Sequence, residues 1–398
     1  MTAHPEYKFP NAQHSFNSNW RWHKLFTMSS MDVALTTIID QVRAAAAQRR
    51  PLRIRGGGTK DFYGQALAGD ILDTRGLDGV ISYEPSELVV TVRSGTPLAV
   101  LEEVLAQSGQ VLAFEPPHFG PGATVGGMVA AGLSGPSRAA VGSARDYVLG
   151  VHMVNGRGEL LQFGGQVMKN VAGYDVSRLL CGSMGTLGLL TQISLKVLPR
   201  ATARATLRFE LDQPGALLQL NRWAGKPLPI QASCWVVDGG RALLHVRLGG
   251  ARAAVDAAIK TMGGEPQDEA RVAADWVALR EQTLPYFDRE AGECLWRLSV
   301  PDTAPVLELP QASQGVLLEW GGALRWVKAP VDAMSALRAV TARVGGSATL
   351  FRHAATAVER VPGVFSPLAE PLARIHHGLK MQFDPHGIFN PGRMVATL

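Results

Sequence analysis

Apolar and polar positions in the first half of the chain predict short strands separated by turns, with a few helices between them. In "MDVALTTIIDQVRAAAAQRR" the apolar residues recur at helical spacing, which predicts an amphipathic helix that begins at Met28 or Met31. Four short apolar or β-branched runs follow, each bounded by turn residues, and they predict the strands "LRIRG", "DILDT", "GVISYEP" and "LVVTVRSG". Residues 1–30 show no regular period, so we expect a disordered extension, with translation starting at Met28 or Met31.

Two helices, a hairpin and a buried strand are predicted next. "TPLAVLEEVLAQSG" predicts a helix with Thr96 as its N-cap and Gly109 as its C-cap, and "TVGGMVAAGLSG" predicts a short helix from Thr124. Strand-like runs on both sides of Asn155-Gly156 predict a β-hairpin. After a short helical run, "DVSRLLCGS", the segment "GLLTQISLKVLP" predicts a buried strand that ends at Pro199.

The pattern changes at about this point, because glycine becomes rarer and tryptophan more frequent. Strand-like runs such as "ALLHVRL" and "LRWVKA" alternate with helical runs such as "ARAAVDAAIKTMG", which is typical of an α+β domain. We therefore expect a domain boundary near Arg200, with one domain over 31–200 and a second over 201–365. The remaining segment, 366–398, ends in the turn-rich "FDPHGIFNPGRM".

Composition and charge argue against several classes of protein. The 398 residues are 46% hydrophobic with a formal net charge of +5 at pH 7, and the basic residues are scattered, which argues against a nucleic-acid partner. The three cysteines, Cys181, Cys234 and Cys294, are far apart, so we expect no disulfide framework, zinc site or iron–sulfur site held by this chain alone. A reducing cytoplasm fits best. No apolar run is long enough to span a bilayer, and no secretory signal is expected at the N-terminus.

Three glycine clusters are the candidate chemistry. They are Gly56-Gly57-Gly58 in "RIRGGGTK", the stretch "GPGATVGG", and "GSMGTLGLLT". A helix that starts at Thr124 should present unpaired N–H groups and the positive end of its dipole, and glycines let an anion approach the backbone without Cβ clashes. Tight packing of small residues and ordinary turns are the alternatives. Neither the G-x-G-x-x-G fingerprint nor the P-loop pattern is present.

The order of these motifs resembles the FAD-binding domain of the vanillyl-alcohol oxidase superfamily. The likeness lies in "RIRGGGTK", "EPSELVVTVRSGTPLAVLEEVLAQSGQ", "PGATVGGMVAAGLSGPSRAAVGSARDYVLGV" and "KNVAGYDVSRLLCGSMGTLGLLTQISLKVLP". Within that superfamily the chain is similar to the FAD-binding E subunits of bacterial glycolate oxidases, especially in "KNVAGYDVSRLLCGSMGTLG" and "FDPHGIFNPGRM". The resemblance implies an α+β fold with a two-subdomain FAD-binding domain over 31–200, an α+β cap domain over 201–365, and a C-terminal segment over 366–398 that returns to the FAD domain.

The resemblance also implies which residues bind FAD. Two loops would hold the pyrophosphate, and further positions would follow the adenosine and the isoalloxazine. The first loop consists of Arg55, Gly56, Gly57, Gly58, Thr59 and Lys60. The second loop contains Gly122, Ala123, Thr124, Gly126 and Gly127. The other positions are Gly132, Gly142, Ser143, Gly188, Leu190 and Asn390.

Several departures from the superfamily bear on the chemistry. Relatives with covalently linked flavin carry a histidine where this chain has Thr59, and some add a cysteine in the second loop, whereas no cysteine here precedes Cys181. The resemblance therefore implies noncovalent FAD. Many catalytic hydroxyacid dehydrogenases have a glutamate in place of Met184 and an "HxGDGNxH"-like stretch in the cap for metal and substrate. That stretch is absent from residues 201–380, so no metal site is expected and the catalytic residues stay unassigned.

Candidate substrate-binding side chains are few. His376 and His377 are adjacent, so on a helix they would point in different directions and are not expected to share one ion. A hydroxyacid carboxylate calls for a guanidinium group, and the candidates are Arg297, Arg325 and Arg352.

The resemblance leaves three functions open. The first is an FAD-dependent oxidoreductase that acts on the CH–OH group of glycolate, in a complex with a larger FAD-containing subunit and an iron–sulfur subunit. Such a complex would lie in the cytoplasm, at the inner face of the membrane. The second is a non-catalytic FAD-carrying subunit that relays electrons or stabilises the same complex. The third is a stand-alone flavin-dependent oxidoreductase for another alcohol or 2-hydroxy acid.

Overall fold

The computed structural model describes residues 28–165, 175–354 and 363–395. The expected extension before Met28 lies outside these residues, as does the "KNVAGY" part of the motif at 169–174. Among the described residues, none of the helices has the length and apolar character needed to cross a membrane.

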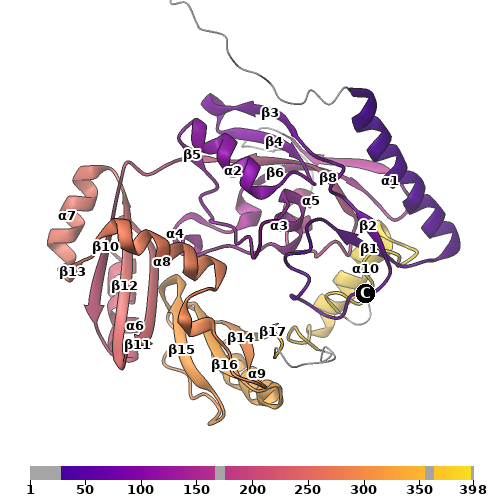
Figure 1. Ribbon diagram of the computed structural model, residues 1–398. Coiled ribbons are helices and arrows are strands. Elements are labelled where there is room, and N and C mark those ends of the chain that lie inside the picture. Colours follow the sequence, from indigo (N-terminus) through magenta and orange to yellow (C-terminus); the bar gives the residue numbers. More distant parts are fainter. Residues whose placement is uncertain (1–27, 166–174, 355–362, 396–398) are drawn as a thin grey trace, which may run out of the picture.

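A small layer is formed by the beginning and the end of the chain. Helix α1 (Met28–Gln48) packs on a parallel pair of strands, β1 (Leu52–Arg55) and β2 (Asp70–Asp73). The C-terminal segment joins this pair through a bridge between Leu52 and Phe389, and it buries Phe389 in the same core as α1. The yellow C-terminal segment therefore lies beside the indigo strands in Figure 1.

A five-stranded sheet follows, with every pair of neighbours antiparallel and the order β3-β4-β8-β6-β7. Its core also holds side chains from the helices around it, and Leu379 and Phe383 of α10 pack against that core. The strands are β3 (Val80–Glu84), β4 (Val89–Arg93), β6 (Val148–Val154), β7 (Leu160–Gly164) and β8 (Leu189–Lys196). The helices are α2 (Leu98–Gln107), α3 (Val125–Ala131), α4 (Arg138–Val141), α5 (Val176–Leu180) and α10 (Glu370–Phe383). We call these two layers together, with the C-terminal segment, the N-terminal region.

An eight-stranded antiparallel sheet forms the rest of the molecule, which we call the cap region. Its order is β13-β10-β12-β11-β15-β16-β14-β17. The strands are β10 (Ala203–Glu210), β11 (Ile230–Asp238), β12 (Arg241–Gly250), β13 (Glu265–Pro266), β14 (Cys294–Ser299), β15 (Gln314–Glu319), β16 (Leu324–Ala329) and β17 (Ser347–Arg352). The helices are α6 (Gln213–Ala224), α7 (Arg252–Met262), α8 (Glu269–Glu281) and α9 (Met334–Arg343).

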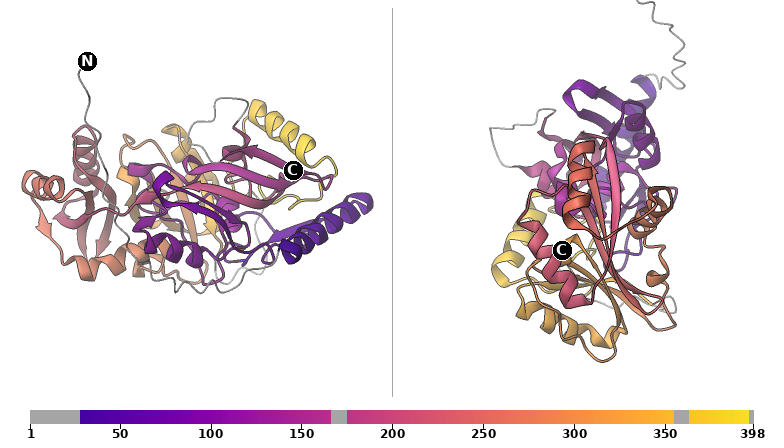
Figure 2. Two further views of the ribbon diagram at one scale, coloured as in Figure 1. Left: turned by 90° about the horizontal axis from the view of Figure 1, so that it is seen from above. Right: turned by 90° about the vertical axis from the view of Figure 1, so that its left-hand side faces the viewer.

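Side-chain alternation gives the cap sheet two different faces. Trp235 and Trp296 point to the outer face, which is covered by α6, α7 and α9. The neighbouring residues Cys234 and Leu295 point to the inner face, where they pack with α8 and with Tyr63 of the N-terminal region. Figures 1 and 2 show the cap sheet on one side of the molecule and the five-stranded sheet on the other.

The predicted α+β fold is confirmed, whereas the domain boundary near Arg200 stays a prediction. Strand β9 (Leu198–Pro199) pairs with β5 (Gln110–Val111) just before the chain enters the cap region at β10. All three cysteines are buried free thiols. The helix α10 was not predicted from the sequence.

Three local predictions differ from the structure or need refinement. The N-cap of α2 is Pro97, because the hydroxyl of Thr96 accepts a hydrogen bond from the N–H of Gly79 (3.0 Å). Its C-cap is Ser108 instead of Gly109. The hairpin is present, but its loop spans residues 155–159, since Oδ1 of Asn155 accepts hydrogen bonds from two backbone N–H groups inside the loop.

Candidate cofactor site

The first and second glycine loops touch each other backbone to backbone. A Cβ atom added to Gly57 would lie 1.5 Å from the carbonyl oxygen of Gly122, and one added to Gly56 would lie 2.3 Å from Oγ1 of Thr124. Contacts this close exclude any side chain at Gly56 and Gly57. The structure thus brings together two loops that are more than sixty positions apart in the chain.

Unpaired N–H groups occur in the first loop. Within the described parts of the chain, the N–H groups of Gly57, Gly58 and Thr59 donate to no protein acceptor. Gly58 has φ of +73°, so the chain bends sharply here and these three groups lie on one bend. Successive N–H groups on such a bend form a concave site for an anion.

The prediction of unpaired N–H groups at the start of α3 is wrong. Thr124 is the N-cap, as predicted, and its Oγ1 accepts a hydrogen bond from the N–H of Gly127 (3.2 Å). In the turn after β4, the carbonyl oxygen of Thr96 accepts a hydrogen bond from the N–H of Val125 (2.9 Å), and that of Ser94 accepts one from the N–H of Gly126 (2.7 Å). The N–H groups of Val125, Gly126 and Gly127 are therefore all hydrogen-bonded within the protein. The second loop contributes mainly its surface to the site.

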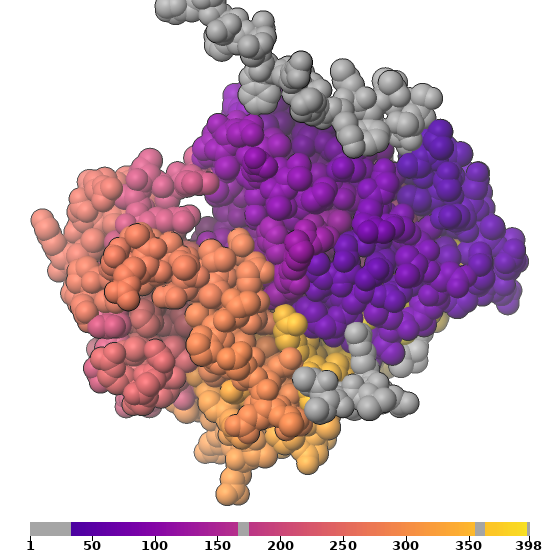
Figure 3. All heavy atoms as spheres, in the orientation of Figure 1, coloured from indigo at the N-terminus to yellow at the C-terminus, as the bar shows by residue number. Residues whose placement is uncertain are grey.

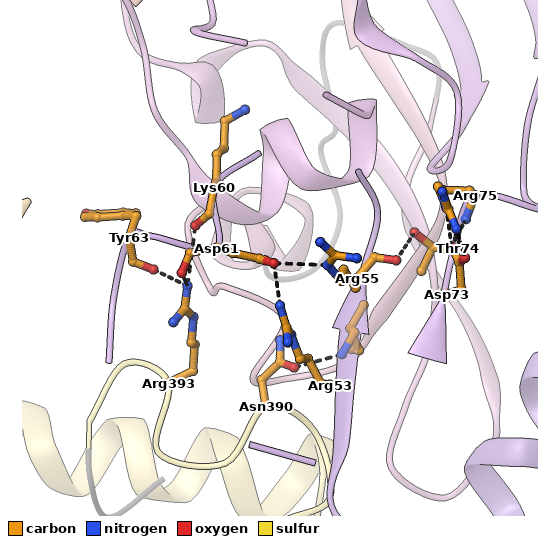
Figure 4. A network of polar contacts seen from close by, with 11 residues as sticks. Arg53, Arg55, Lys60, Asp61, Tyr63, Asp73, Thr74, Arg75, Asn390 and Arg393 are labelled. Atoms are coloured by element: carbon orange, nitrogen blue, oxygen red, sulfur yellow. Dashed lines mark hydrogen bonds and ion pairs between the residues drawn. The ribbon is translucent and has the colours of Figure 1, made fainter. Parts of the chain in front are cut away.

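Positive side chains surround the first loop, and an acidic residue holds two of them. Oδ2 of Asp61 accepts hydrogen bonds from Arg53 and from Nε of Arg55 (3.0 Å). Figure 4 shows that Lys60 points away from this network. Burial lowers the pKa of Lys60 to about 8, although the nearby carboxylate of Glu281 opposes the shift. Its Nζ donates to the carbonyl oxygen of His118 (3.2 Å).

The C-terminal segment also contacts the first loop and the residues that follow it. Arg393 is 5% exposed, and its guanidinium donates to the carbonyl oxygens of Asp61 (3.0 Å), Tyr63 and Gln65. Figure 4 shows Arg393 reaching this loop. The residues after β1 are therefore held in place by the last residues that the structure describes.

Asn390 ties three parts of the site together. Its Oδ1 accepts a hydrogen bond from the N–H of Ile54 (2.8 Å), and its Nδ2 donates to the carbonyl oxygen of Met184 (2.7 Å). Its own N–H donates to Leu52 (2.9 Å). Both Asn390 and Met184 have positive φ angles, +40° and +53°, so each sits in a sharp bend beside the loops.

Two adjoining cavities of about 100 Å³ and 70 Å³ lie between these loops. They share Gly56, Gly127 and Asn390 in their walls, so they form the two halves of one slot. The predicted residues in the larger cavity are Arg55, Gly56, Gly57, Gly58, Thr59, Lys60, Thr124, Gly127 and Asn390. Those in the smaller cavity are Gly56, Gly126, Gly127, Gly188, Leu190 and Asn390.

Five predicted residues line neither cavity. Gly122 forms the backbone contact described above, and Ala123 is buried at the base of the second loop. Gly132 is the C-cap of α3, with φ of +63°. Ser143 donates to Asp146 through its N–H (2.8 Å) and its hydroxyl (2.9 Å), while Gly142 before it has φ of +96°. Contact of these five residues with the cofactor stays a prediction.

The three candidate arginines have different environments. Arg325 is 1% exposed and donates to the carbonyl oxygens of three residues in the cap region, so it is buried away from any substrate carboxylate. Nε of Arg352 donates to Gln282 (2.9 Å), and its guanidinium lies 3.7 Å from the ring centroid of Phe62. Arg297 lines a cavity on the inner face of the cap sheet and is the best placed of the three.

The space between the first loop and the cap sheet is largely filled by aromatic rings. The ring centroids of Phe62 and Phe119 are 5.3 Å apart, and those of Phe62 and Phe351 are 5.6 Å apart. The cavity beside Arg297 measures only about 30 Å³. Burial raises the pKa of Glu319 in its wall to about 7, while a hydrogen bond from Trp326 and the charge of Arg297 pull it down.

Sequence reasoning missed Asp61, Tyr63 and Arg393. Asp61 directly follows "GGGTK", and an acidic residue beside two arginines was the available signal. Arg393 belongs to the quoted tail "FNPGR", but nothing local shows which loop it reaches. The structure describes no group of three or more His, Cys, Asp or Glu residues that could hold a metal ion in the ranges that it covers.

The site fits the diphosphate of a dinucleotide cofactor. A diphosphate needs several donors and positive charge in a narrow space. The bend at 57–59 supplies the donors, Arg55 and Lys60 supply the charge, and the contact between the loops excludes side chains from the centre. The slot continues on both sides, as an extended molecule requires.

Comparison with known proteins agrees with this geometry. The family model described as an FAD binding domain matches residues 35–164. A solved structure of alkyldihydroxyacetonephosphate synthase superposes with a TM-score of 0.62 and 15% identity, over 89% of this chain and 75% of that chain, which shows the fold alone. The molecule is an FAD-binding protein that shares the fold of this synthase.

Sequence relatives narrow the class. Glycolate oxidase subunit GlcE of Escherichia coli (strain K12) is 45% identical over 362 residues, which are 91% of this chain and 97% of that protein. This chain belongs to the GlcE family of glycolate oxidase subunits. Glycolate oxidase subunit GlcD of Bacillus subtilis (strain 168) is 30% identical over 43% of this chain and 37% of its own. D-2-hydroxyglutarate dehydrogenase of Xanthomonas citri pv. viticola is 26% identical over 70% and 62%, respectively.

Proposed function

We propose that this chain is the FAD-carrying subunit of a complex that oxidises glycolate to glyoxylate. The observation that carries the proposal is the bend at 57–59, with three unpaired N–H groups pressed against the second glycine loop. Because successive N–H groups on a bend bind anions, this bend would hold the FAD diphosphate. Bound FAD would supply the redox chemistry, which is the acceptance of two electrons from the CH–OH carbon of glycolate.

The protein's own residues would bind and orient the cofactor. The first loop donates its N–H groups to the diphosphate, and Arg55 and Lys60 neutralise part of its charge. The slot lined by Gly126, Gly188 and Leu190 accommodates the rest of the nucleotide. Thr59 lacks a nucleophilic nitrogen or sulfur atom, so the flavin is bound noncovalently. The remaining predicted positions, Gly132, Gly142 and Ser143, belong to this proposal only through the family resemblance.

The complex would contain a larger FAD-containing subunit and an iron–sulfur subunit. The three cysteines of this chain are buried and far apart, so electrons that leave the flavin need a cluster on another chain. We place the complex in the cytoplasm, at the inner face of the membrane.

A second candidate function is electron relay or scaffolding without contact to glycolate. The aromatic rings of Phe62, Phe119 and Phe351 favour it, because they fill the space in which a substrate would face the first loop. The cavity of about 30 Å³ beside Arg297 is too small for glycolate unless the rings move. The same slot holds FAD under both candidates.

A flavin spectrum of the purified chain tests the proposal. The chain, refolded or expressed with excess FAD, should be yellow and should hold about one FAD after gel filtration. Anaerobic addition of glycolate then separates the two candidates: bleaching of the flavin band supports direct oxidation, and an unchanged band that dithionite bleaches supports relay. A folded chain that stays colourless contradicts both. Copurification with a cysteine-rich iron–sulfur chain tests the partners.

A further inference from the structure

A cavity larger than the flavin slot lies elsewhere in the described residues. It measures about 560 Å³ and lies where the chain passes from the N-terminal region into the cap region. Strands β5 and β9 form one wall, and strands β10, β11 and β12 with helix α8 form the other. Figure 3 shows the surface hollowed beside the pink segment that follows residue 200. Its volume is within the range of about 300–1,000 Å³ that small-molecule sites usually have.

Four arginines line this cleft, and they differ in their ion pairing. Arg247 pairs with Glu115 (2.7 Å) and Arg280 pairs with Glu281 (2.8 Å). Arg200 and Arg204 have no acidic partner within 4.0 Å in the ranges that the structure covers.

Arg204 stands in an environment that disfavours its charge. Burial, and next the positive charge of Arg247, lower the pKa of Arg204 more than the carboxylates of Glu115 and Glu269 raise it, and Arg200 adds a smaller repulsion. An anion placed between Arg200 and Arg204 would relieve both effects.

The acidic residues of the cleft are already engaged. Oε2 of Glu269 accepts a hydrogen bond from the hydroxyl of Thr206 (3.2 Å). Oε2 of Glu102 lies 3.0 Å from Nε2 of His118. Glu115 is neutralised by Arg247. Arg200 and Arg204 are the two arginines of the cleft that form no ion pair in the ranges that the structure covers.

Two further observations mark the cleft as a binding site. Arg247 is 4% exposed, and its Nε has no hydrogen-bond partner among the described residues; Oε1 of Gln231 is buried in the same wall with no partner either. Apolar surface lies beside these groups, because Trp276 and Val277 of α8 also line the cleft. Buried polar atoms without partners next to apolar surface favour a ligand that has both kinds of group.

We propose that this cleft binds a small organic anion. Its carboxylate or phosphate group pairs with Arg200 and Arg204, and its apolar or planar body lies against Trp276 and Val277. Because the walls belong to both regions, the bound anion holds the cap region against the N-terminal region. The site is separate from the flavin slot, so the proposal does not depend on the reaction of the flavin.

Calorimetric titration of the flavin-loaded chain tests the proposal with a matched pair of probes. Indole-3-acetate carries a planar body and a carboxylate, and indole-3-acetamide has the same shape without the charge. Indole-3-acetate should bind at millimolar concentration or below, at least about tenfold more tightly than the amide, since the amide lacks the charge-assisted bonds. Inorganic phosphate should compete if the arginines also accept a phosphate.

Three substitutions locate the binding. Arg204→Ala should weaken indole-3-acetate about tenfold. Arg208→Ala is the matched control, because Arg208 is on the same strand but pairs with Glu265 outside the cleft (2.5 Å); it should leave the affinity unchanged. Glu269→Gln should tighten binding, because it removes a negative charge that faces the anion. The proposal is overturned if indole-3-acetate does not bind, if the amide binds equally well, or if Arg204→Ala and Arg208→Ala act alike.

Discussion

Gly57 and Gly122 face each other across the two loops, yet a methyl group would act differently at the two positions. At Gly57 the new Cβ would lie 1.5 Å from the carbonyl oxygen of Gly122, so the loops would have to separate. At Gly122 the closest protein atom would be the carbonyl oxygen of Gly57 at 3.5 Å, which is an ordinary contact. The protein alone therefore explains a glycine at 57 but not at 122.

The pair of variants Gly57→Ala and Gly122→Ala tests whether the cofactor explains the second glycine. We expect Gly57→Ala to lose FAD and to lower the free energy of unfolding of the apoprotein by about 1–3 kcal/mol, the usual cost of overpacking. Gly122→Ala should leave the apoprotein's stability unchanged and still weaken FAD binding, because its Cβ would occupy space beside the diphosphate. FAD content after gel filtration and urea unfolding measure the two effects. Full FAD affinity in Gly122→Ala would contradict the proposed position of the diphosphate.

Lys60 predicts a pH dependence for FAD binding. With its pKa lowered to about 8 by burial, Lys60 of the apoprotein is charged below pH 8 and neutral above it. A bound diphosphate favours the charged form, so above pH 8 binding must be accompanied by uptake of a proton. The association constant for FAD should therefore fall with rising pH above 8, by at most about tenfold per pH unit.

Titration of the apoprotein by flavin fluorescence between pH 7 and pH 10 measures this slope. The matched variant is Lys60→Arg, because a guanidinium stays charged throughout this range. Its association constant should change little over the same interval. Equal slopes for the two proteins would show that another group controls the pH dependence.

At the scale of secondary structure, periodicity predicted most strands and helices of the N-terminal region, because their apolar faces follow from local sequence. Periodicity could not predict which carbonyl oxygens accept hydrogen bonds from the backbone N–H groups. The start of α3 was expected to offer unpaired N–H groups, but the turn after β4 brings the carbonyl oxygens of Ser94 and Thr96 to Val125 and Gly126. Thr96 failed as a predicted cap for the same reason, since it pairs with Gly79. Both errors arise from contacts between segments that are distant in sequence.

Helix α10 ends in a buried ion pair that positions the tail of the site. Nζ of Lys380 donates to Oδ2 of Asp384 (2.8 Å) and to the carbonyl oxygens of Thr186 (2.7 Å) and Phe389 (2.9 Å). The carboxylate of Asp384 accepts in turn from the N–H groups of Ile388 (3.1 Å) and Phe389 (2.8 Å). The exposed fractions of Lys380 and Asp384 are 4% and 0%. The pair thus holds the turn that places Asn390 beside the slot.

Asp384→Asn should destabilise the protein by about 3 kcal/mol, because the variant leaves the ammonium group of Lys380 buried without its counter-charge. Asparagine also replaces one of the two accepting oxygens by an NH2 group, so the loss reports the charge together with a hydrogen bond. FAD affinity should fall as well, since the turn before Asn390 loosens. Urea unfolding and FAD titration measure the two effects.

Arg374→Ala on the same helix is the control for this variant. Arg374 forms an exposed pair with Glu370 (3.5 Å), and exposed pairs contribute little. Stability and FAD affinity should both stay near the wild-type values. If Asp384→Asn behaves like Arg374→Ala, the buried pair does not support the tail.

For the whole molecule, the sequence could predict two regions and the two glycine loops, but not the way in which the regions meet. The loops were recognisable because an ordinary turn rarely needs three glycines in a row and because the order of the motifs resembles a known superfamily. The interface between the N-terminal region and the cap region, which we call the seam, includes contacts between single residues from each region. Nε1 of Trp320 donates to the carbonyl oxygen of Gly135 (3.0 Å), and the guanidinium of Arg138 lies 4.5 Å from the ring centroid of Trp320. No periodicity or motif marks such pairs.

The ion pair between Glu115 and Arg247 joins the N-terminal region to the cap region. NH2 of Arg247 donates to both carboxylate oxygens, at 2.7 Å and 2.8 Å. Burial alone would raise the pKa of Glu115, but the charge of Arg247 and the hydrogen bonds from Arg247 and Ser137 outweigh it and hold the pKa below 4.5. A depressed carboxyl pKa stabilises the fold above the unfolded-state pKa, and this contribution is lost as the pH falls through the folded-state value.

Glu115→Gln should therefore lower the free energy of unfolding by about 3 kcal/mol at pH 7, because Arg247 is then buried without its partner. The difference from the wild type should shrink as the pH falls from the unfolded-state pKa of Glu115 through its lower folded-state pKa, because the wild-type carboxyl group then also becomes neutral. Urea unfolding of both proteins between pH 3 and pH 7 measures this convergence. Glu265→Gln, which affects the surface pair with Arg208, should stay close to the wild type throughout. If the free energies of unfolding of Glu115→Gln and the wild type differ by the same amount at every pH, the seam depends on the shape of Glu115 and not on its charge.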